Sequence, residues 1–72
     1  MSTFSECCRQ LLSESESSVY EISKESGLDR TSIQRMITGK RMPSIQFVEK
    51  FCDHLRITPI ERAELLELYR IE

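Results

Sequence analysis

Apolar residues recur at helical spacing in five stretches of the chain, and polar or helix-breaking residues separate these stretches. The spacing i, i+3, i+4, i+7 indicates one buried face of an α-helix. Three of the stretches contain Phe4, Cys7, Cys8, Leu11 and Leu12; Ile33, Met36 and Ile37; and Ile45, Val48, Phe51, Cys52 and Leu55. The other two begin near Val19 and Pro59. Because no stretch alternates with the period of two that is typical of a strand, we predict an all-α, compact five-helix domain.

Capping signals mark where these helices begin. In a capping box, a hydroxyl residue is followed three residues later by Glu, and each side chain reaches the backbone N–H of the other residue. The chain contains this pattern at Thr3–Glu6, Ser18–Glu21 and Thr58–Glu61. Ser44, directly after Pro43, is expected to cap the fourth helix. The polar residues 13–17, SESES, interrupt the apolar spacing, so we expect a loop there or one further solvated helical turn.

The stretch that begins near Val19 is the second in chain order, and the stretch that contains Ile33 is the third. They are joined by a segment that is typical of a helix-turn-helix. Gly27 follows the second stretch, at a position where a left-handed backbone favours a residue without Cβ. Asp29 can then cap the next helix, and Leu28 and Ile33 have the spacing of a hydrophobic staple. Two short helices separated by about three residues form a helix-turn-helix.

The helix expected over residues 30–38 has two contrasting faces. Its apolar residues share one face, which we expect to pack inward. The other face carries side chains that can hydrogen-bond to base edges or contact the thymine methyl group, namely Arg30, Thr31, Gln34, Arg35 and Thr38. A solvated polar face would be the ordinary interpretation of such a helix in isolation. The preceding helix, the lack of acids and the basic turn that follows favour a surface that reads DNA.

The distribution of charge supports a nucleic-acid partner, although the total charge does not. The net charge is −2 and the pI is about 5.4, whereas DNA-binding domains are usually basic. Residues 30–48 nevertheless carry four cationic side chains and no acid, while residues 1–17, 18–29 and 49–72 each sum to −2. A polyanion orients a molecule with one positive pole, and the acidic remainder limits indiscriminate binding.

With these features, residues 19–55 resemble the helix-turn-helix domain of the lambda-repressor/Cro-like (XRE-type) transcriptional regulators. The five-helix domain of that family would occupy nearly the whole chain. The matching positions are Ile22, Ser23, Gly27, Ile33, Arg35 and, most specifically, the run Gly39-Lys40-Arg41-x-Pro43-Ser44. The chain departs from the family pattern at Val19, where Gln is common, and at Ser23, where Ala is frequent. It also has Ile37 and Thr38 where Glu and Asn are common.

The resemblance implies a function in sequence-specific binding of double-stranded DNA as a transcriptional regulator. It implies that four side chains of the third helix read bases in the major groove, namely Arg30, Thr31, Gln34 and Arg35. It also implies that the turn after this helix binds backbone phosphate. The N-terminus of the second helix should lie near another phosphate, because its unpaired N–H groups attract anions. We therefore assign the DNA backbone contacts to Ser18, Thr38, Lys40, Arg41 and Ser44.

The sequence indicates neither a metal site nor an enzyme. Cys7, Cys8 and Cys52 lie on inward stripes, so we expect buried thiols rather than metal ligands. Cys52 and His54 are two residues apart on one helix and would point in different directions. The single His and the lack of a Gly-rich phosphate loop leave no recognisable set of acid, base and nucleophile. We expect no cofactor and, without a membrane span or leader sequence, a cytoplasmic protein.

The last stretch supports an alternative function, a protein-interaction module. Its apolar residues spread round more of the helix than one core contact requires, namely Ile60, Ala63, Leu65, Leu66, Leu68, Tyr69 and Ile71. They would pair two copies as a homodimer or pack against a further C-terminal domain. An antitoxin or antirepressor acting mainly on a protein would use the same helix. We expect residues 1–72 to form a single DNA-binding domain, and the helical pattern continuing to Glu72 favours the N-terminal part of a longer regulator.

Overall fold

The computed structural model describes residues 3–71 of the chain, and most of them are helical. In chain order the helices are α1 (Phe4–Glu14), α2 (Val19–Ser26), α3 (Arg30–Ile37), α4 (Ile45–Asp53) and α5 (Pro59–Ile71). No strand occurs within this described range, which confirms the all-α prediction. The prediction that the helical pattern reaches Glu72 lies outside the described residues.

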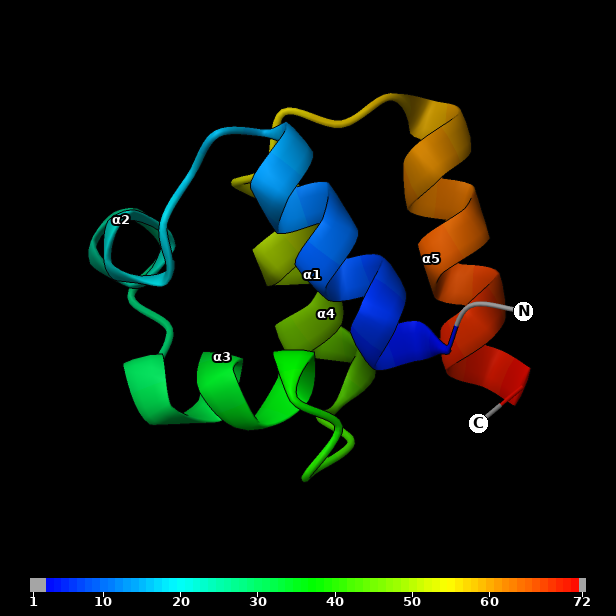
Figure 1. Cartoon of the computed structure of the whole chain (residues 1–72), viewed down its shortest axis with the longest axis horizontal. Helices are drawn as coiled ribbons and strands as arrows, with labels where there is room; N and C mark the ends of the chain where they lie inside the picture. Colours follow the sequence, from blue (N-terminus) through cyan, green and yellow to red (C-terminus); the bar gives the residue numbers. More distant parts are fainter. Residues whose placement is uncertain (1–2, 72) are drawn as a thin grey trace.

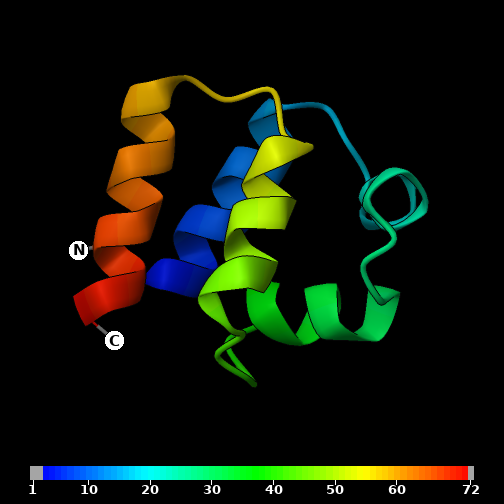
Figure 2. The ribbon, with the colours of Figure 1, turned by 180° about the vertical axis from the view of Figure 1, so that it is seen from behind.

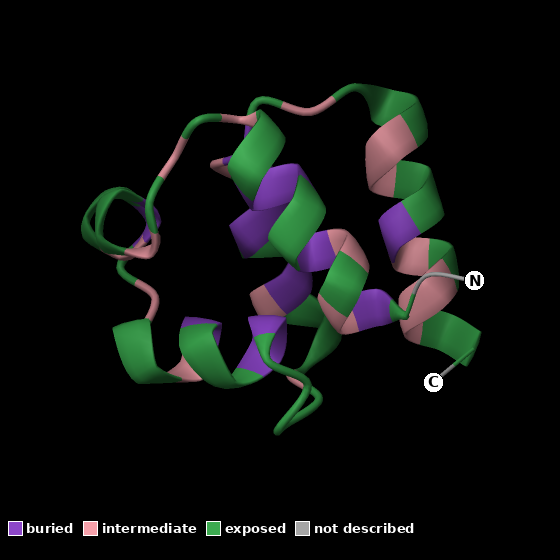
Figure 3. Ribbon diagram, viewed as in Figure 1, coloured by how far each residue is buried: buried purple, intermediate pink, exposed green. Residues whose placement is uncertain are grey.

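The helices enclose one core. α1 and α4 lie in the middle of the molecule, with α5 on one side and α2 on the other, and α3 runs along the edge below α2 (Figure 1). α1 packs against both α3 and α5, while α2 packs against α3 and α4. The largest fully buried side chains come from all five helices: Phe4, Phe51, Ile22, Ile33, Met36, Leu65, Val48 and Cys8. Figure 3 shows that the buried positions of each helix face the centre of the molecule, as their spacing predicts.

One residue of the expected core, Ile45, is wrongly placed by its sequence spacing. Ile45 is three residues before the buried Val48, but its side chain is 37% exposed. It is the first residue of α4, directly after the Ser44 cap, where the apolar stripe begins. Phe47 is half-buried and packs against the core from the same turn of α4.

The predicted capping signals are present, with one difference in detail. At Ser18 and Thr58 the hydroxyl accepts from the N–H of the Glu three residues on, and the carboxylate of that Glu accepts from the cap N–H. Thr3 caps α1 in the same way, accepting from the N–H of Glu6 at 3.2 Å. Its own hydroxyl, however, donates to the Glu6 carboxylate at 3.1 Å. A cap satisfies a backbone donor that the first helical turn leaves unpaired, which fixes where each helix begins.

The SESES segment divides between helix and loop. α1 includes Ser13 and Glu14, so the alternative of a further helical turn is correct for these two residues. The chain turns at residues 15 and 16, where Glu16 has a left-handed backbone with φ 57°. The Ser15 N–H donates to the Leu11 carbonyl at 3.0 Å, and its hydroxyl donates to the Leu12 carbonyl at 2.9 Å. These bonds satisfy the carbonyls that the end of α1 would otherwise leave unpaired.

Candidate nucleic-acid interface

α2 and α3 are joined by residues 27–29, the short turn that the sequence predicts. Gly27 has φ 78°, in the left-handed region, and its N–H donates to the Ser23 carbonyl at 2.9 Å. The Ser23 hydroxyl donates in turn to the Leu28 carbonyl at 2.6 Å. Ser23 therefore stabilises the turn with a hydrogen bond that Ala would not make.

Ser26, the last residue of α2, has a role that the sequence did not reveal. It is the one buried polar residue in the described range, and its hydroxyl donates to the Ile22 carbonyl. The same oxygen accepts from the Leu28 N–H at 3.1 Å. A buried hydroxyl needs such partners, and one of these lies in α2 and the other in the turn. Ser23 and Ser26 therefore both connect α2 to Leu28 in the turn that leads to α3.

α3 is held at both of its ends. The Asp29 carboxylate accepts from the Ser32 N–H at 3.0 Å and from the Ser32 hydroxyl at 3.2 Å, as expected for the predicted cap. At the other end, the Arg9 guanidinium of α1 donates to the Ile37 carbonyl. This cation interacts favourably with the negative end of the helix dipole. The sequence spacing gave no signal for the contact, because Arg9 is 28 residues away.

The two faces of α3 are as predicted. Ile33, Met36 and Ile37 are buried. The residues of the predicted polar face are exposed, namely Arg30, Thr31, Gln34, Arg35 and Thr38. Within residues 3–71, no hydrogen bond or ion pair engages the side chains of Thr31, Gln34 or Arg35. These donors and acceptors are therefore available to a ligand without breaking an existing interaction. Arg30 differs, because its guanidinium carbon lies 5.8 Å from the centre of the Tyr20 ring.

The basic turn, residues 39–44, projects from the same edge of the molecule as α3 (Figures 1 and 2). Lys40 and Arg41 are exposed, and the N–H groups of both donate to the Arg35 carbonyl, at 2.9 and 3.3 Å. Gly39 has φ 76°, and a Cβ at this position would lie 3.1 Å from the Ser5 hydroxyl oxygen. Gly39 therefore combines a left-handed backbone with a close approach to α1.

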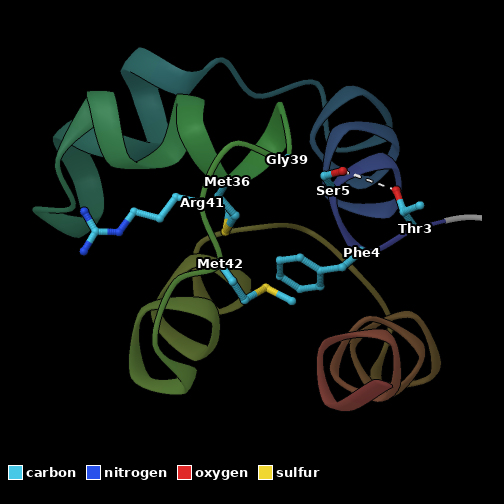
Figure 4. Close-up of a pocket in the computed structure, with 7 residues that line it drawn as sticks. All are labelled: Thr3, Phe4, Ser5, Met36, Gly39, Arg41 and Met42. Carbon is cyan, nitrogen blue, oxygen red and sulfur yellow. Dashed lines mark hydrogen bonds between the residues drawn. The ribbon is translucent and has the colours of Figure 1, made fainter. Parts of the chain in front are cut away.

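Met42 and Arg41 extend in opposite directions from the basic turn. Figure 4 shows Met42 beside the buried Phe4 ring, while the Arg41 side chain extends away from it. The Pro43 carbonyl accepts a hydrogen bond from the Tyr69 hydroxyl of α5 at 2.7 Å. The turn is thus tied to α1 and α5 on its inner side, and it presents its cations on the outer side.

The three hydroxyls assigned to the DNA backbone are not equally available. The Ser18 and Ser44 oxygens accept from the N–H groups of Glu21 and Phe47, at 3.1 and 3.3 Å, which leaves each hydroxyl proton able to donate to a phosphate. The Thr38 hydroxyl instead donates to the Gln34 carbonyl at 2.7 Å, so its proton is already engaged. The N-terminus of α2 also carries the Glu21 carboxylate, 3.2 Å from the Ser18 N–H, which reduces its attraction for an anion.

The positive charge of residues 30–48 is not neutralised by neighbouring acids. The one ion pair of the described chain joins Arg62 to Asp53 at 2.6 Å, and it involves α5 and the end of α4. Arg30, Arg35, Lys40 and Arg41 are all exposed. The edge formed by α3 and the basic turn therefore carries four cations in contact with solvent, a surface suited to a polyanion.

The cysteines are placed as buried or half-buried thiols. Cys8 and Cys52 are buried, Cys7 is half-buried, and burial raises the pKa of Cys52 to about 11. Burial also raises the pKa of Cys7, with smaller contributions from nearby carboxylates. A protonated thiol is a poor metal ligand and a poor nucleophile. In the part of the chain that the structure describes, no three His, Cys, Asp or Glu residues are grouped to hold a metal ion.

No helix between residues 3 and 71 has the length and apolar character of a membrane span.

This geometry defines a helix-turn-helix protein, and comparison with known families agrees. A family model described as "Helix-turn-helix domain" matches residues 5–65. The chain belongs to this family, because the match covers most of its length. The match and the five-helix architecture agree with the lambda-repressor-like fold that the sequence predicts. No curated protein and no solved structure matches the chain significantly.

Proposed function

We propose that this chain binds double-stranded DNA sequence-specifically, as a transcriptional regulator, with α3 in the major groove. The observation that carries this proposal is the exposed polar face of α3, whose side chains are almost free of internal partners, continuous with a basic turn that no acid neutralises. An α-helix with its side chains is about 10–12 Å in diameter, and the major groove is about 12 Å wide, so the groove admits a helix. Membership of a helix-turn-helix family supports the same function.

The proposed contacts divide into base reading and backbone binding. Base reading belongs to α3, through Arg30, Thr31, Gln34 and Arg35, of which Arg favours guanine and Gln favours adenine. Backbone binding belongs to Lys40, Arg41 and the hydroxyls of Ser18 and Ser44. Thr38 joins this second group only if its hydroxyl leaves the Gln34 carbonyl. Backbone contacts set the register of the protein on the duplex, whereas base contacts set the sequence.

The experiment compares Arg35→Ala with Arg41→Ala on duplexes selected from a random pool. Arg35→Ala should cost roughly 1–3 kcal/mol on the preferred site and relax the choice at one base pair. Arg41→Ala should weaken selected and unselected duplexes by similar factors, since phosphate contacts carry no sequence information. Both side chains are exposed, so unfolding free energies should stay within about 0.5 kcal/mol of the parent. A uniform loss in both variants would remove Arg35 from base reading.

A second candidate binding surface, for another copy of the chain, is the outer face of α5. Ile60 and Ile71 are 71% and 73% exposed, and their spacing of eleven residues places them on one stripe. Ala63, Glu64, Glu67 and Leu68 line an apolar depression on the same helix. We propose that a second copy of the chain binds here, because two copies are needed to read a two-fold operator.

A further inference from the structure

Tyr20 is an exposed aromatic residue in the helix that precedes the reading helix. It is the second residue of α2, its side chain is 57% exposed, and it makes no contribution to the buried core. Its ring lies opposite the first residue of α3, with 5.8 Å between the ring centre and the Arg30 guanidinium carbon. This separation is within the range of a cation–π interaction. The two side chains line a depression together with Thr31 and Gln34 of α3.

Nothing else in the described chain orients Arg30. No acid forms an ion pair with it, and the neighbouring Asp29 carboxylate is already engaged by the N–H and hydroxyl of Ser32. An exposed Arg side chain has many rotamers, and a bidentate contact to guanine requires its planar group in one orientation. The Tyr20 ring is the group placed to select that orientation before DNA binds.

We propose that Tyr20 is a positioning residue for Arg30 and thereby helps to set base preference, an inference that rests on the proposed DNA-binding function. The ring restrains the guanidinium at the N-terminus of α3, so less rotamer freedom is lost when Arg30 meets a base. Tyr20 acts through Arg30 and reads no base itself. Its removal should therefore affect the base pair that Arg30 contacts and leave the choices at the Gln34 and Arg35 positions unchanged.

The test is a double-mutant cycle on the preferred duplex, with Tyr20→Leu, Arg30→Ala and the double variant. Tyr20→Leu alone should weaken binding about two- to fivefold, the strength expected of an exposed cation–π contact, and relax one base pair. In the Arg30→Ala background the same substitution should have no effect, because there is no guanidinium left to position. Tyr20→Phe keeps the ring and removes only the hydroxyl, so it should retain parental affinity and base preference.

Each other outcome overturns the proposal in a distinguishable way. An equal loss from Tyr20→Leu in both backgrounds would mean that Tyr20 contacts DNA directly or acts on the fold. A loss from Tyr20→Phe as large as that from Tyr20→Leu would assign the effect to the hydroxyl rather than the ring. If the parent protein selected no sequence from a random pool, the proposed function itself would fail. If the parent protein selected a sequence but the cycle gave no coupling between Tyr20 and Arg30, only the positioning role of Tyr20 would be removed.

Discussion

The hydroxyl of Tyr69 donates a hydrogen bond of 2.7 Å to the carbonyl of Pro43, across 26 residues of sequence. The ring of Tyr69 also meets Phe4 edge-on, with 5.5 Å between the ring centres. One residue of α5 therefore contacts both the first helix and the turn that carries Lys40 and Arg41. The last helix contributes to the shape of the candidate DNA interface although it lies on the other side of the core (Figure 1).

Substitution of Tyr69 by Phe should separate the hydrogen bond from the ring contact. Phe keeps the edge-on packing against Phe4 and removes only the donor to Pro43. We expect the free energy of unfolding to fall by about 1 kcal/mol, the net contribution of one such hydrogen bond. DNA affinity should fall as well, because the cations of the turn lose one of their anchors. Urea unfolding and duplex titration measure the two effects, and an unchanged unfolding midpoint would show that the bond contributes nothing.

The two glycines provide a matched comparison for the basic turn. Gly27 and Gly39 have nearly equal φ values of 78° and 76°, so Ala at either position costs about 1–2 kcal/mol for the left-handed backbone. A Cβ at Gly27 meets nothing within 4 Å, whereas at Gly39 it meets the Ser5 hydroxyl at 3.1 Å. We therefore expect Gly39→Ala to lower the melting temperature more than Gly27→Ala. Adding Ser5→Ala should remove the difference, and equal losses in the two single variants would contradict the close approach.

Features with a local cause could be predicted from the sequence. A capping box depends on two residues in one turn, and a buried helix face depends on spacing of three and four, so the helix starts and the inward face of α3 were predicted correctly. Ile45 has the correct spacing and is nevertheless exposed, because burial also requires another element to cover that turn. The periodic pattern contains no information about where the neighbouring helices end.

Contacts between distant residues could not be predicted in this way. The bonds from Arg9 to Ile37 and from Tyr69 to Pro43 depend on how α1 and α5 pack, which no local pattern specifies. For the candidate interface, the exposure of Arg30 follows from helical spacing, but its approach to Tyr20 depends on the angle between α2 and α3. The assignment of particular side chains to bases or phosphates stays a prediction.

Stability should fall at high pH because of Cys52. Burial raises its pKa from an ordinary value of 9.0 to about 11, so at a pH between these values the folded state keeps a proton that the unfolded chain releases. The unfolded state then binds fewer protons, and the free energy of unfolding decreases as pH rises from about 9 to about 11. Cys52→Ala should be less stable at pH 7 but should lose less stability across this range. If the free energy of unfolding fell equally with pH in the parent and in Cys52→Ala, Cys52 would not be the cause of the decrease.

Salt dependence should report how many phosphates the interface neutralises. If Arg30 and Arg35 read bases, Lys40 and Arg41 supply most of the backbone neutralisation, and log affinity should fall with log salt with a slope of roughly −2 to −3 per bound monomer. Lys40→Ala should make the slope shallower by about 1. Gln46→Ala is a suitable control, because Gln46 is exposed beyond the turn and uncharged. An affinity that stayed constant from low to high salt would favour a protein partner over DNA.

The role of α5 in assembly can be tested at residues that contribute differently to the core. A single copy has one short reading helix and few phosphate contacts, so it should bind DNA weakly. Useful specificity would then require two copies on half-sites about 34–36 Å apart. Ile71 is 73% exposed, so Ile71→Glu should leave the melting temperature nearly unchanged. If α5 forms the dimer, this variant should sediment as a monomer, and its affinity for paired half-sites should fall towards that for a single half-site.

Leu68→Glu serves as the comparison, because Leu68 is half-buried and packs against the core from the side of the same helix. A charge placed there is partly removed from water without a partner, so we expect this variant to lose stability in addition to any effect on pairing. Normal paired-site affinity and an unchanged sedimentation coefficient for Ile71→Glu would eliminate the outer stripe of α5 as the interface. Leu68→Glu alone could instead lose paired-site binding, in proportion to its loss of folded protein. The apolar residues of α5 would then be assigned to packing against the core and not to binding a second copy.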